Sequence, residues 1–223
     1  MITAFEAARL IDISAVRTCH GLNDILKLVE IAREYRFINV HVLPAWVSTI
    51  APMVKEIGGV YVGAPVGFPS GGHATETKVL EALRLVRDGA EEIDIMMNVG
   101  KLKSGEMDYA LDDIRTVIQA IGDKAIKKVI IEINALTDDE MLAACKLAMD
   151  SDATFVKTGT GWLPGDANIE RIRKIKQYCG TNIKVKAAGG IRTREEFLTL
   201  VDMGVERMGI NTQSAIQIVK SLG

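Results

Sequence analysis

The chain has 223 residues, of which 48% are hydrophobic and 25% are charged, and its formal net charge is -2. This composition is ordinary for a globular protein and excludes disordered, collagen-like and disulfide-stapled chains. Lysine and arginine are interspersed with aspartate and glutamate, so the large basic surface of a nucleic-acid or membrane-surface binder is absent. We therefore expect neither a nucleic-acid partner nor a membrane partner.

The cysteines and the first residues indicate the cellular compartment. Cys19, Cys145 and Cys179 are odd in number and far apart, which is typical of unpaired thiols in a reducing environment. Glu6 and Arg9 interrupt the segment in which a secretory leader needs an apolar run,. No stretch approaches the ~20 apolar residues of a membrane span. We expect a cytoplasmic protein.

Short runs rich in valine and isoleucine alternate with longer amphipathic stretches along the chain. The predicted strands are residues 9–14, 38–43, 60–66, 91–99, 127–133, 153–158, 183–188 and 206–210. Strands that alternate with helices imply a parallel sheet, and eight such units in one domain, residues 1–223, favour a closed (β/α)8 TIM barrel. The alternative is an open doubly wound sheet, which is disfavoured because no G-x-G-x-x-G follows the first strand.

Three helices carry clear local patterns. The segment 75–90 has apolar residues at helical spacing, namely Val79, Leu80, Leu83 and Val86, and a glycine, Gly89, at its end,. Two further helices begin with a capping box, in which a threonine precedes a glutamate by three residues. These pairs are Thr137 with Glu140 and Thr193 with Glu196.

Two lysines stand at the ends of neighbouring predicted strands. Lys157 lies in the apolar run ATFVKTGTG, and Lys186 lies in IKVKAAGG on the next unit. Burial and a second cation both disfavour the ammonium form, which yields a neutral amine able to attack a carbonyl. The alternative is a pair of strand-end lysines that reach solvent. The pairing favours an imine-forming nucleophile.

Carboxylates also interrupt apolar strands. Asp94 lies in the middle of EEIDIMMNV, Asp12 lies on the first strand, and Glu132 lies in KVIIEI. An unpaired buried carboxylate is costly, so we expect Asp94 to face a buried lysine across the barrel. Asp94 is either a proton relay to the imine centre or part of a structural ion pair. The sequence assigns no role to Glu132.

Glycine-rich turns follow the last two strands. Gly189 and Gly190 precede one predicted helix, and Gly209 with Asn211 and Thr212 precedes the last. Loops in these places commonly form a phosphate cradle from backbone N–H groups and a helix N-terminus. The alternative is ordinary helix capping. The histidine spacing fits no metal motif, so we predict no metal; His41 lies on a strand and faces either the pocket or the core,.

At these residues the chain resembles the deoxyribose-phosphate aldolase family, which are Schiff-base aldolases on a TIM barrel. The resemblance runs nearly end to end. It is carried by PVGFPSG (65–71), TETKVLEA (75–82), DGAEEIDIMMNVGKLKSGE (88–106), KVIIEI (128–133), FVKTGTG (155–161) and VKAAGGIRT (185–193). It implies reversible cleavage of 2-deoxyribose 5-phosphate to glyceraldehyde 3-phosphate and acetaldehyde, with no cofactor.

The resemblance also implies roles for individual residues. Lys157 matches the lysine that forms the Schiff base, and Lys186 matches the lysine that tunes it. Asp94 matches the proton-relay aspartate, and Asp12 matches the aspartate of the first strand. The positions at which the family binds the sugar phosphate are Thr160, Gly161, Gly189, Gly190, Gly209, Asn211 and Thr212.

Several positions depart from the family pattern and leave the identity of the phosphorylated sugar open. The departures are Ile13 for histidine, His41 for cysteine, Leu43 for asparagine or tyrosine, Gly159 for serine, and Asn211 in place of a serine turn. One alternative is the same imine chemistry on another phosphorylated aldol. Two others are a barrel that binds a sugar phosphate without catalysis and an isomerase with a carboxylate base. Barrel aldolases of this kind often pair, so the resemblance also implies that a homo-oligomer is possible.

Overall fold

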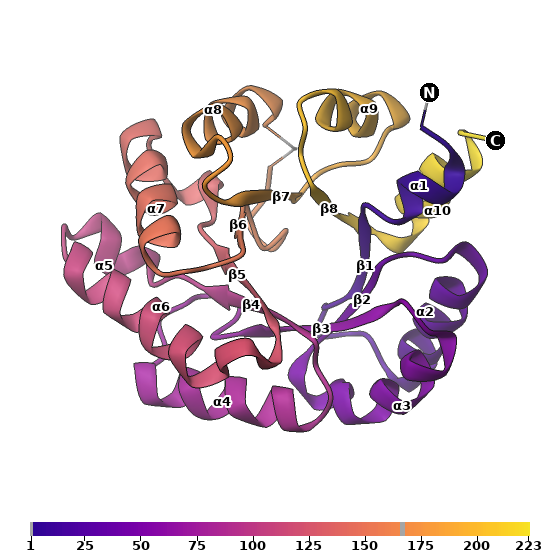
Figure 1. Cartoon of the computed structure of the whole chain (residues 1–223), viewed down its shortest axis with the longest axis horizontal. Helices are drawn as coiled ribbons and strands as arrows, with labels where there is room; N and C mark the ends of the chain where they lie inside the picture. The colour runs from indigo at the N-terminus through magenta and orange to yellow at the C-terminus, as the bar shows by residue number, and fades with distance from the viewer. Residues whose placement is uncertain (1, 166–167) are drawn as a thin grey trace.

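The computed structural model describes residues 2–165 and 168–223. In this part of the chain, eight parallel strands close into one barrel in sequence order (Figure 1). The strands are β1 (Ile11–Ala15), β2 (Asn39–Val42), β3 (Tyr61–Val66), β4 (Glu92–Met96), β5 (Ile126–Ile130), β6 (Phe155–Lys157), β7 (Lys184–Ala188) and β8 (Arg207–Asn211). The barrel prediction is confirmed. The alternative prediction of an open, doubly wound sheet is wrong, because β8 pairs with β1 and closes the barrel. Of the predicted domain, Met1, Asp166 and Ala167 lie outside the described residues.

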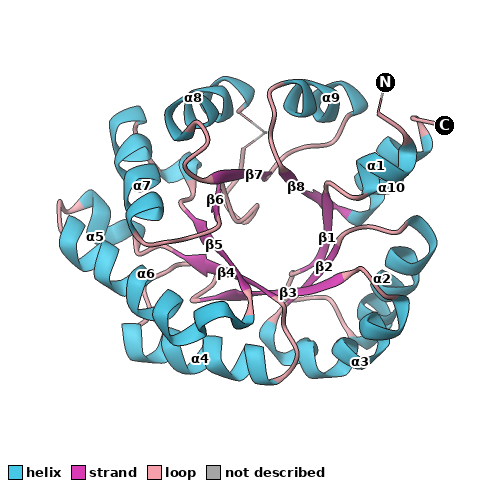
Figure 2. Cartoon of the chain, in the orientation of Figure 1, coloured by secondary structure: helices cyan, strands magenta, loops and turns pink. Residues whose placement is uncertain are grey.

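Helices form a ring outside the strands, as Figure 2 shows. The α-helices are α1 (Ala4–Ala8), α2 (Leu22–Tyr35), α3 (Val47–Ile57), α4 (Thr75–Arg87), α5 (Val99–Lys103), α6 (Met107–Ile121), α7 (Asp138–Asp150), α8 (Ile169–Cys179), α9 (Arg194–Asp202) and α10 (Thr212–Lys220). Short 3-10 turns are η1 (Pro44–Trp46), η2 (Gly122–Lys124) and η3 (Ile133–Ala135). No helix in the described ranges is long and apolar enough to cross a membrane.

The strands follow a period of two that sorts their side chains. In β4, Ile93 and Ile95 are fully buried in the apolar core, while Asp94 between them bonds to lysines inside the barrel. Successive strand residues point to opposite faces. An apolar strand interrupted by one ionisable residue therefore places that residue in the barrel interior.

The helices begin where the predicted capping boxes place them, but the buried face of α4 differs from the face that its apolar spacing predicted. Both predicted capping boxes form, and they begin α7 and α9 directly after strand-end loops. In α4, however, Leu80 and Leu83 are exposed, whereas Lys78 is fully buried. The Lys78 ammonium group donates to Asp113 of α6 at 2.6 Å and to the Met96 carbonyl at 3.0 Å. These bonds stabilise the buried ammonium group, so Lys78, and not Leu80 or Leu83, lies on the face of α4 that packs against the core.

Candidate active site

A cavity of about 590 Å³ opens at the carboxyl ends of the strands. Asp12, His41, Lys157 and Lys186 line it from strands β1, β2, β6 and β7. The loops after β1, β3, β6 and β7 and the last residues of β8 form its rim. The carboxyl ends of barrel strands are where barrel enzymes hold their active sites.

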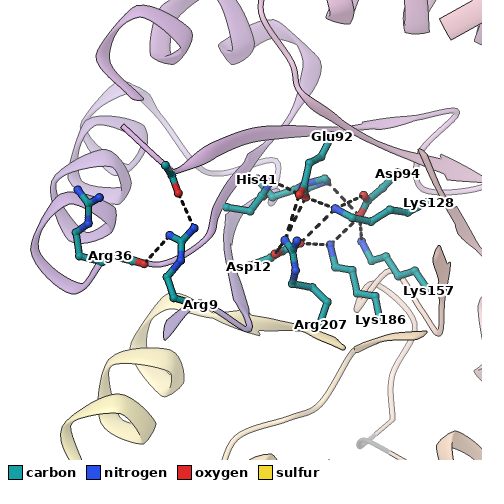
Figure 3. Close-up of polar contacts among 12 residues, drawn as sticks. Arg9, Asp12, Arg36, His41, Glu92, Asp94, Lys128, Lys157, Lys186 and Arg207 are labelled. Atoms are coloured by element: carbon teal, nitrogen blue, oxygen red, sulfur yellow. Dashed lines mark hydrogen bonds and ion pairs between the residues drawn. The ribbon is translucent and has the colours of Figure 1, made fainter. Parts of the chain in front are cut away.

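The two lysines predicted from the sequence meet on one carboxylate oxygen. Lys157 and Lys186 are in register on neighbouring strands. The Nζ atom of Lys157 lies 2.8 Å from Asp94 Oδ2, and the Nζ atom of Lys186 lies 2.9 Å from the same oxygen (Figure 3). Lys186 also pairs with Asp12 at 2.5 Å. The structure therefore brings all four predicted catalytic residues into one contact network.

A deeper layer of charged residues supports this network. Lys128 of β5 is fully buried; it pairs with Glu92 and lies 3.3 Å from Asp94 Oδ1 and 3.5 Å from Asp12 Oδ2. Arg207 of β8 donates to Asp12 Oδ1 at 2.6 Å and to Glu92 Oε1 at 3.2 Å. Lys128, Glu92 and Arg207 were not among the residues predicted from the sequence. Their signal was an ionisable residue next to or inside an apolar strand, the same signal that identified Asp94.

The surroundings of each group set its ionisation. Burial lowers the pKa of Lys157, Asp94 opposes this, and the Lys186 ammonium lowers it further, which leaves the pKa at about 8. Burial would raise the pKa of Asp94, but the ammonium groups of Lys128, Lys157 and Lys186 hold it well below its usual range. Burial would likewise raise the pKa of Asp12, but Lys186, Lys128 and Arg207 lower it. Both aspartates are ionised at neutral pH.

The charges of this cluster balance when one lysine is neutral. Three carboxylates, Asp12, Glu92 and Asp94, face four cations, Lys128, Lys157, Lys186 and Arg207. Burial would lower the pKa values of Lys128 and Arg207, but the carboxylates raise both above their usual range. Lys157 is the member of the cluster whose pKa falls toward neutrality, so it is the amine most readily deprotonated.

The glycine-rich loops beside this cluster have backbone conformations that favour glycine. Gly161, Gly189 and Gly190 have φ angles of 71°, 94° and 86°, a region that favours glycine. All three line the cavity together with Gly209 and Asn211. The loop after β7 leads into the N-terminus of α9. Backbone N–H groups at a helix N-terminus stabilise an anion.

Two of the residues predicted to bind phosphate have other neighbours in the structure. Thr212 does not line this cavity; as the first residue of α10 it lines a separate hollow between α2 and α10. The Asn211 side chain caps α10, because its Oδ1 accepts from the Ser214 N–H at 3.0 Å and its Nδ2 donates to Ser214 Oγ at 2.9 Å. The sequence could not separate a capping residue from a ligand-binding residue at the same turn.

The model of the DeoC/LacD family aldolases matches residues 22–212 of this chain. The chain belongs to this family. It is 44% identical over 215 residues to the deoxyribose-phosphate aldolase of Rhizobium meliloti, covering 96% of this chain and 86% of that protein. It is 42% identical over 213 residues to the same-named enzyme of Bacillus subtilis, covering 96% and 94%. The solved structure of QR15, an aldolase, matches with a TM-score of 0.91 at 32% identity, covering 97% and 95%.

Gly159 departs from the serine that the family commonly has at this position, and the neighbouring side chain of Glu132 explains why a glycine fits here. A Cβ atom at Gly159 would lie 2.8 Å from Glu132 Oε1. The Glu132 carboxylate is buried and accepts both the N–H of Thr160 at 3.2 Å and its hydroxyl proton. The Thr160 hydroxyl then accepts the Trp162 N–H at 3.0 Å. Glu132 therefore shapes the loop after Lys157, and both hydrogen-bond donors of Thr160 bond to its carboxylate.

The rim of the aldolase cavity contains aromatic and cationic side chains that the sequence analysis did not single out. The Arg17 guanidinium lies 5.7 Å from the ring centroid of Trp162 and donates to the Gly161 carbonyl at 2.6 Å. Phe68 contacts Trp162 edge to face, with centroids 5.6 Å apart. All of these residues line the cavity. No local sequence pattern identified them, because they come from three different loops.

Proposed function

We propose that this aldolase reversibly cleaves 2-deoxyribose 5-phosphate into acetaldehyde and glyceraldehyde 3-phosphate through a Schiff base on Lys157. The relatives named above are deoxyribose-phosphate aldolases. The observation that carries the proposal is the buried contact of Lys157 with Asp94 and Lys186, in a cluster that is electrically balanced when Lys157 is a free amine.

The reaction begins at the amine. The free Lys157 amine attacks C1 of the open-chain sugar, and loss of water gives a protonated imine. The C3 hydroxyl then loses its proton, the C2–C3 bond breaks, and the electron pair of that bond moves into the iminium group. Glyceraldehyde 3-phosphate leaves with C3 as its carbonyl carbon. The remaining enamine takes a proton at C2, and water releases acetaldehyde and the amine.

The ionised carboxylates move and balance charge in these steps. Asp94 Oδ2 contacts Lys157 and Lys186, so it lies beside the atom at which the imine forms. In our proposal Asp94 is the relay for the C3 hydroxyl proton, and like-charge repulsion from the Lys186 ammonium helps burial to lower the pKa of Lys157, which raises its free-amine fraction,. Asp12 holds Lys186 in place from β1.

The phosphate occupies the rim at the glycine loops in this proposal. Gly161, Gly189, Gly190 and Gly209 offer backbone there without side chains. The α9 N-terminus adds the positive end of its dipole,. The sugar then spans the cavity, with C1 at Lys157 and C5 toward these loops. Binding energy from the phosphate orients the reacting carbons.

Borohydride trapping tests this proposal directly. Reduction during turnover of 2-deoxyribose 5-phosphate fixes the imine as a stable amine, which peptide mass spectrometry locates. We expect the adduct on Lys157 in the wild type and none in Lys157→Ala, with activity lower by several orders of magnitude. Lys184→Leu is the matched control, since Lys184 is exposed on the same strand as Lys186. An active Lys157→Ala enzyme would favour an isomerase with a carboxylate base.

We also propose that the enzyme works in the cytoplasm without a nucleic-acid partner, as its composition indicates. A homo-oligomer stays a prediction. Light scattering coupled to size-exclusion chromatography measures the assembled mass directly, and cell fractionation with an antibody against the chain locates it.

A further inference from the structure

His41 is a buried polar side chain whose hydrogen-bonding capacity is unused. It is 4% exposed, it lines the cavity, and neither ring nitrogen has a hydrogen-bond partner among the described residues. Its Nε2 lies 3.8 Å from Asp94 Oδ2 (Figure 3), which is too long for a hydrogen bond,. Buried polar groups are nearly always paired, so an unpaired one at a binding cavity needs an explanation.

The neighbouring strand makes room for this ring. A Cβ atom at Gly63 of β3 would lie 2.4 Å from His41 Nδ1, so any other residue at position 63 would displace the imidazole. His41 and Gly63 are in register on paired strands. The two positions together hold the ring over the β3 backbone at the cavity wall. The absence of a side chain at Gly63 therefore makes the space that the His41 ring occupies.

The environment keeps the ring neutral. Burial lowers the pKa of His41 well below its usual range, Asp94 opposes this, and the lysines of the cluster add to the lowering. A neutral imidazole offers one hydrogen-bond donor and one acceptor, which suits a hydroxyl group that keeps its proton.

We propose that His41 hydrogen-bonds to a hydroxyl group on the carbon next to the imine, so that the site takes α-hydroxylated donors as well as acetaldehyde. The reach fits, because His41 Nε2 and Lys157 Nζ lie 3.8 and 2.8 Å from the same Asp94 oxygen. This inference rests on the proposed imine at Lys157. It names the donor class: two-carbon aldehydes with a hydroxyl on C2, and the phosphorylated pentoses formed from them.

The corresponding synthesis balances with the groups already present. Glycolaldehyde and Lys157 form an iminium with loss of water. A proton then leaves the hydroxymethyl carbon, and the resulting enamine forms the new C–C bond to the carbonyl carbon of glyceraldehyde 3-phosphate. The acceptor oxygen takes a proton, and water releases the pentose 5-phosphate. The hydroxyl that His41 binds is kept throughout.

Donor competition tests the inference. The ratio of kcat/KM for glycolaldehyde to that for acetaldehyde, with glyceraldehyde 3-phosphate as acceptor, is measured in the wild type, His41→Leu and His41→Gln. We expect His41→Leu to lower this ratio at least about tenfold, and His41→Gln to restore part of it, because the amide keeps a donor and an acceptor. His73→Leu is the control, since His73 is exposed and away from the cavity lining.

The outcomes separate the two proposals. A wild type that turns over acetaldehyde but not glycolaldehyde overturns the role of His41 and leaves the proposed function intact. A ratio unchanged in His41→Leu, or a loss equal for both donors, also overturns it, because His41 would then serve only structure. A wild type that is inactive with both donors and forms no borohydride adduct overturns the proposed function and this inference with it.

Discussion

Lys186→Leu removes one of the two ammonium groups that share Asp94 Oδ2. The pKa of Lys157 is about 8 in the intact cluster. The two nitrogens lie 2.8 and 2.9 Å from one oxygen, and unit charges ~5 Å apart interact by about 3 kcal/mol at an effective dielectric of ~20. Since one pKa unit corresponds to about 1.4 kcal/mol, we expect the pKa of Lys157 to rise by about 1 to 2 units.

The pH dependence of kcat/KM reads this shift. The nucleophile must be deprotonated, so kcat/KM rises with pH through the pKa of Lys157, and in the variant the rise moves to higher pH. At pH 7 a shift of about 1 to 2 units lowers the free-amine fraction roughly 10- to 100-fold. At pH values above the shifted pKa, the variant recovers toward the wild-type rate. Cleavage of 2-deoxyribose 5-phosphate is followed between pH 6 and 10 by coupled detection of glyceraldehyde 3-phosphate.

Lys184→Leu is the matched control for this experiment. Lys184 lies two residues earlier on the same strand and is exposed; its ammonium group faces the Phe155 ring rather than the carboxylates. Its profile should overlay that of the wild type. A Lys186→Leu profile that is uniformly lower but unshifted would refute the like-charge argument, and would leave Lys186 a role in orientation or proton transfer only.

Two further substitutions test the scaffold around the site. Asp113→Ala leaves the fully buried Lys78 ammonium without its carboxylate partner at 2.6 Å, and we expect urea denaturation to show a loss of about 3–5 kcal/mol in the free energy of unfolding. The control is Asp112→Ala, which removes an exposed ion pair at 3.8 Å and should cost less than about 0.5 kcal/mol. Equal losses in the two variants would contradict the reasoning. Gly159→Ala places a methyl group 2.8 Å from Glu132 Oε1. We expect a loss of about 1–3 kcal/mol in stability and a higher KM for the sugar phosphate, and an unchanged stability and KM would argue against the loop role of Glu132.

The strand pattern determined much of this protein. Runs such as KKVIIEI and ATFVKT are β-branched and short, and a strand buried on both faces needs that composition. An ionisable residue inside such a run has no place except the barrel interior or its mouth. The sequence therefore predicted that Lys157, Lys186 and Asp94 lie together, and the capping boxes at Thr137 and Thr193 predicted where helices begin.

Other features required the closed barrel. In β5, Lys127 and Lys128 are adjacent and identical, and strand alternation sends one inward without saying which; the structure buries Lys128 among carboxylates and leaves Lys127 bonded to the Gly122 carbonyl. Arg207 looked like an ordinary residue at a strand start, but closure of β8 onto β1 brings it to Asp12.

Local sequence thus decided which elements form and which residues face inward, because side-chain periodicity and capping act over a few residues. Distant pairings were decided by the tertiary structure, because they depend on register across the barrel. The space that Gly63 leaves for His41, and that Gly159 leaves for Glu132, arises only when separate segments pack together. For that reason the sequence predicted imine chemistry at Lys157, while the fit around the donor carbon became visible only in the folded chain.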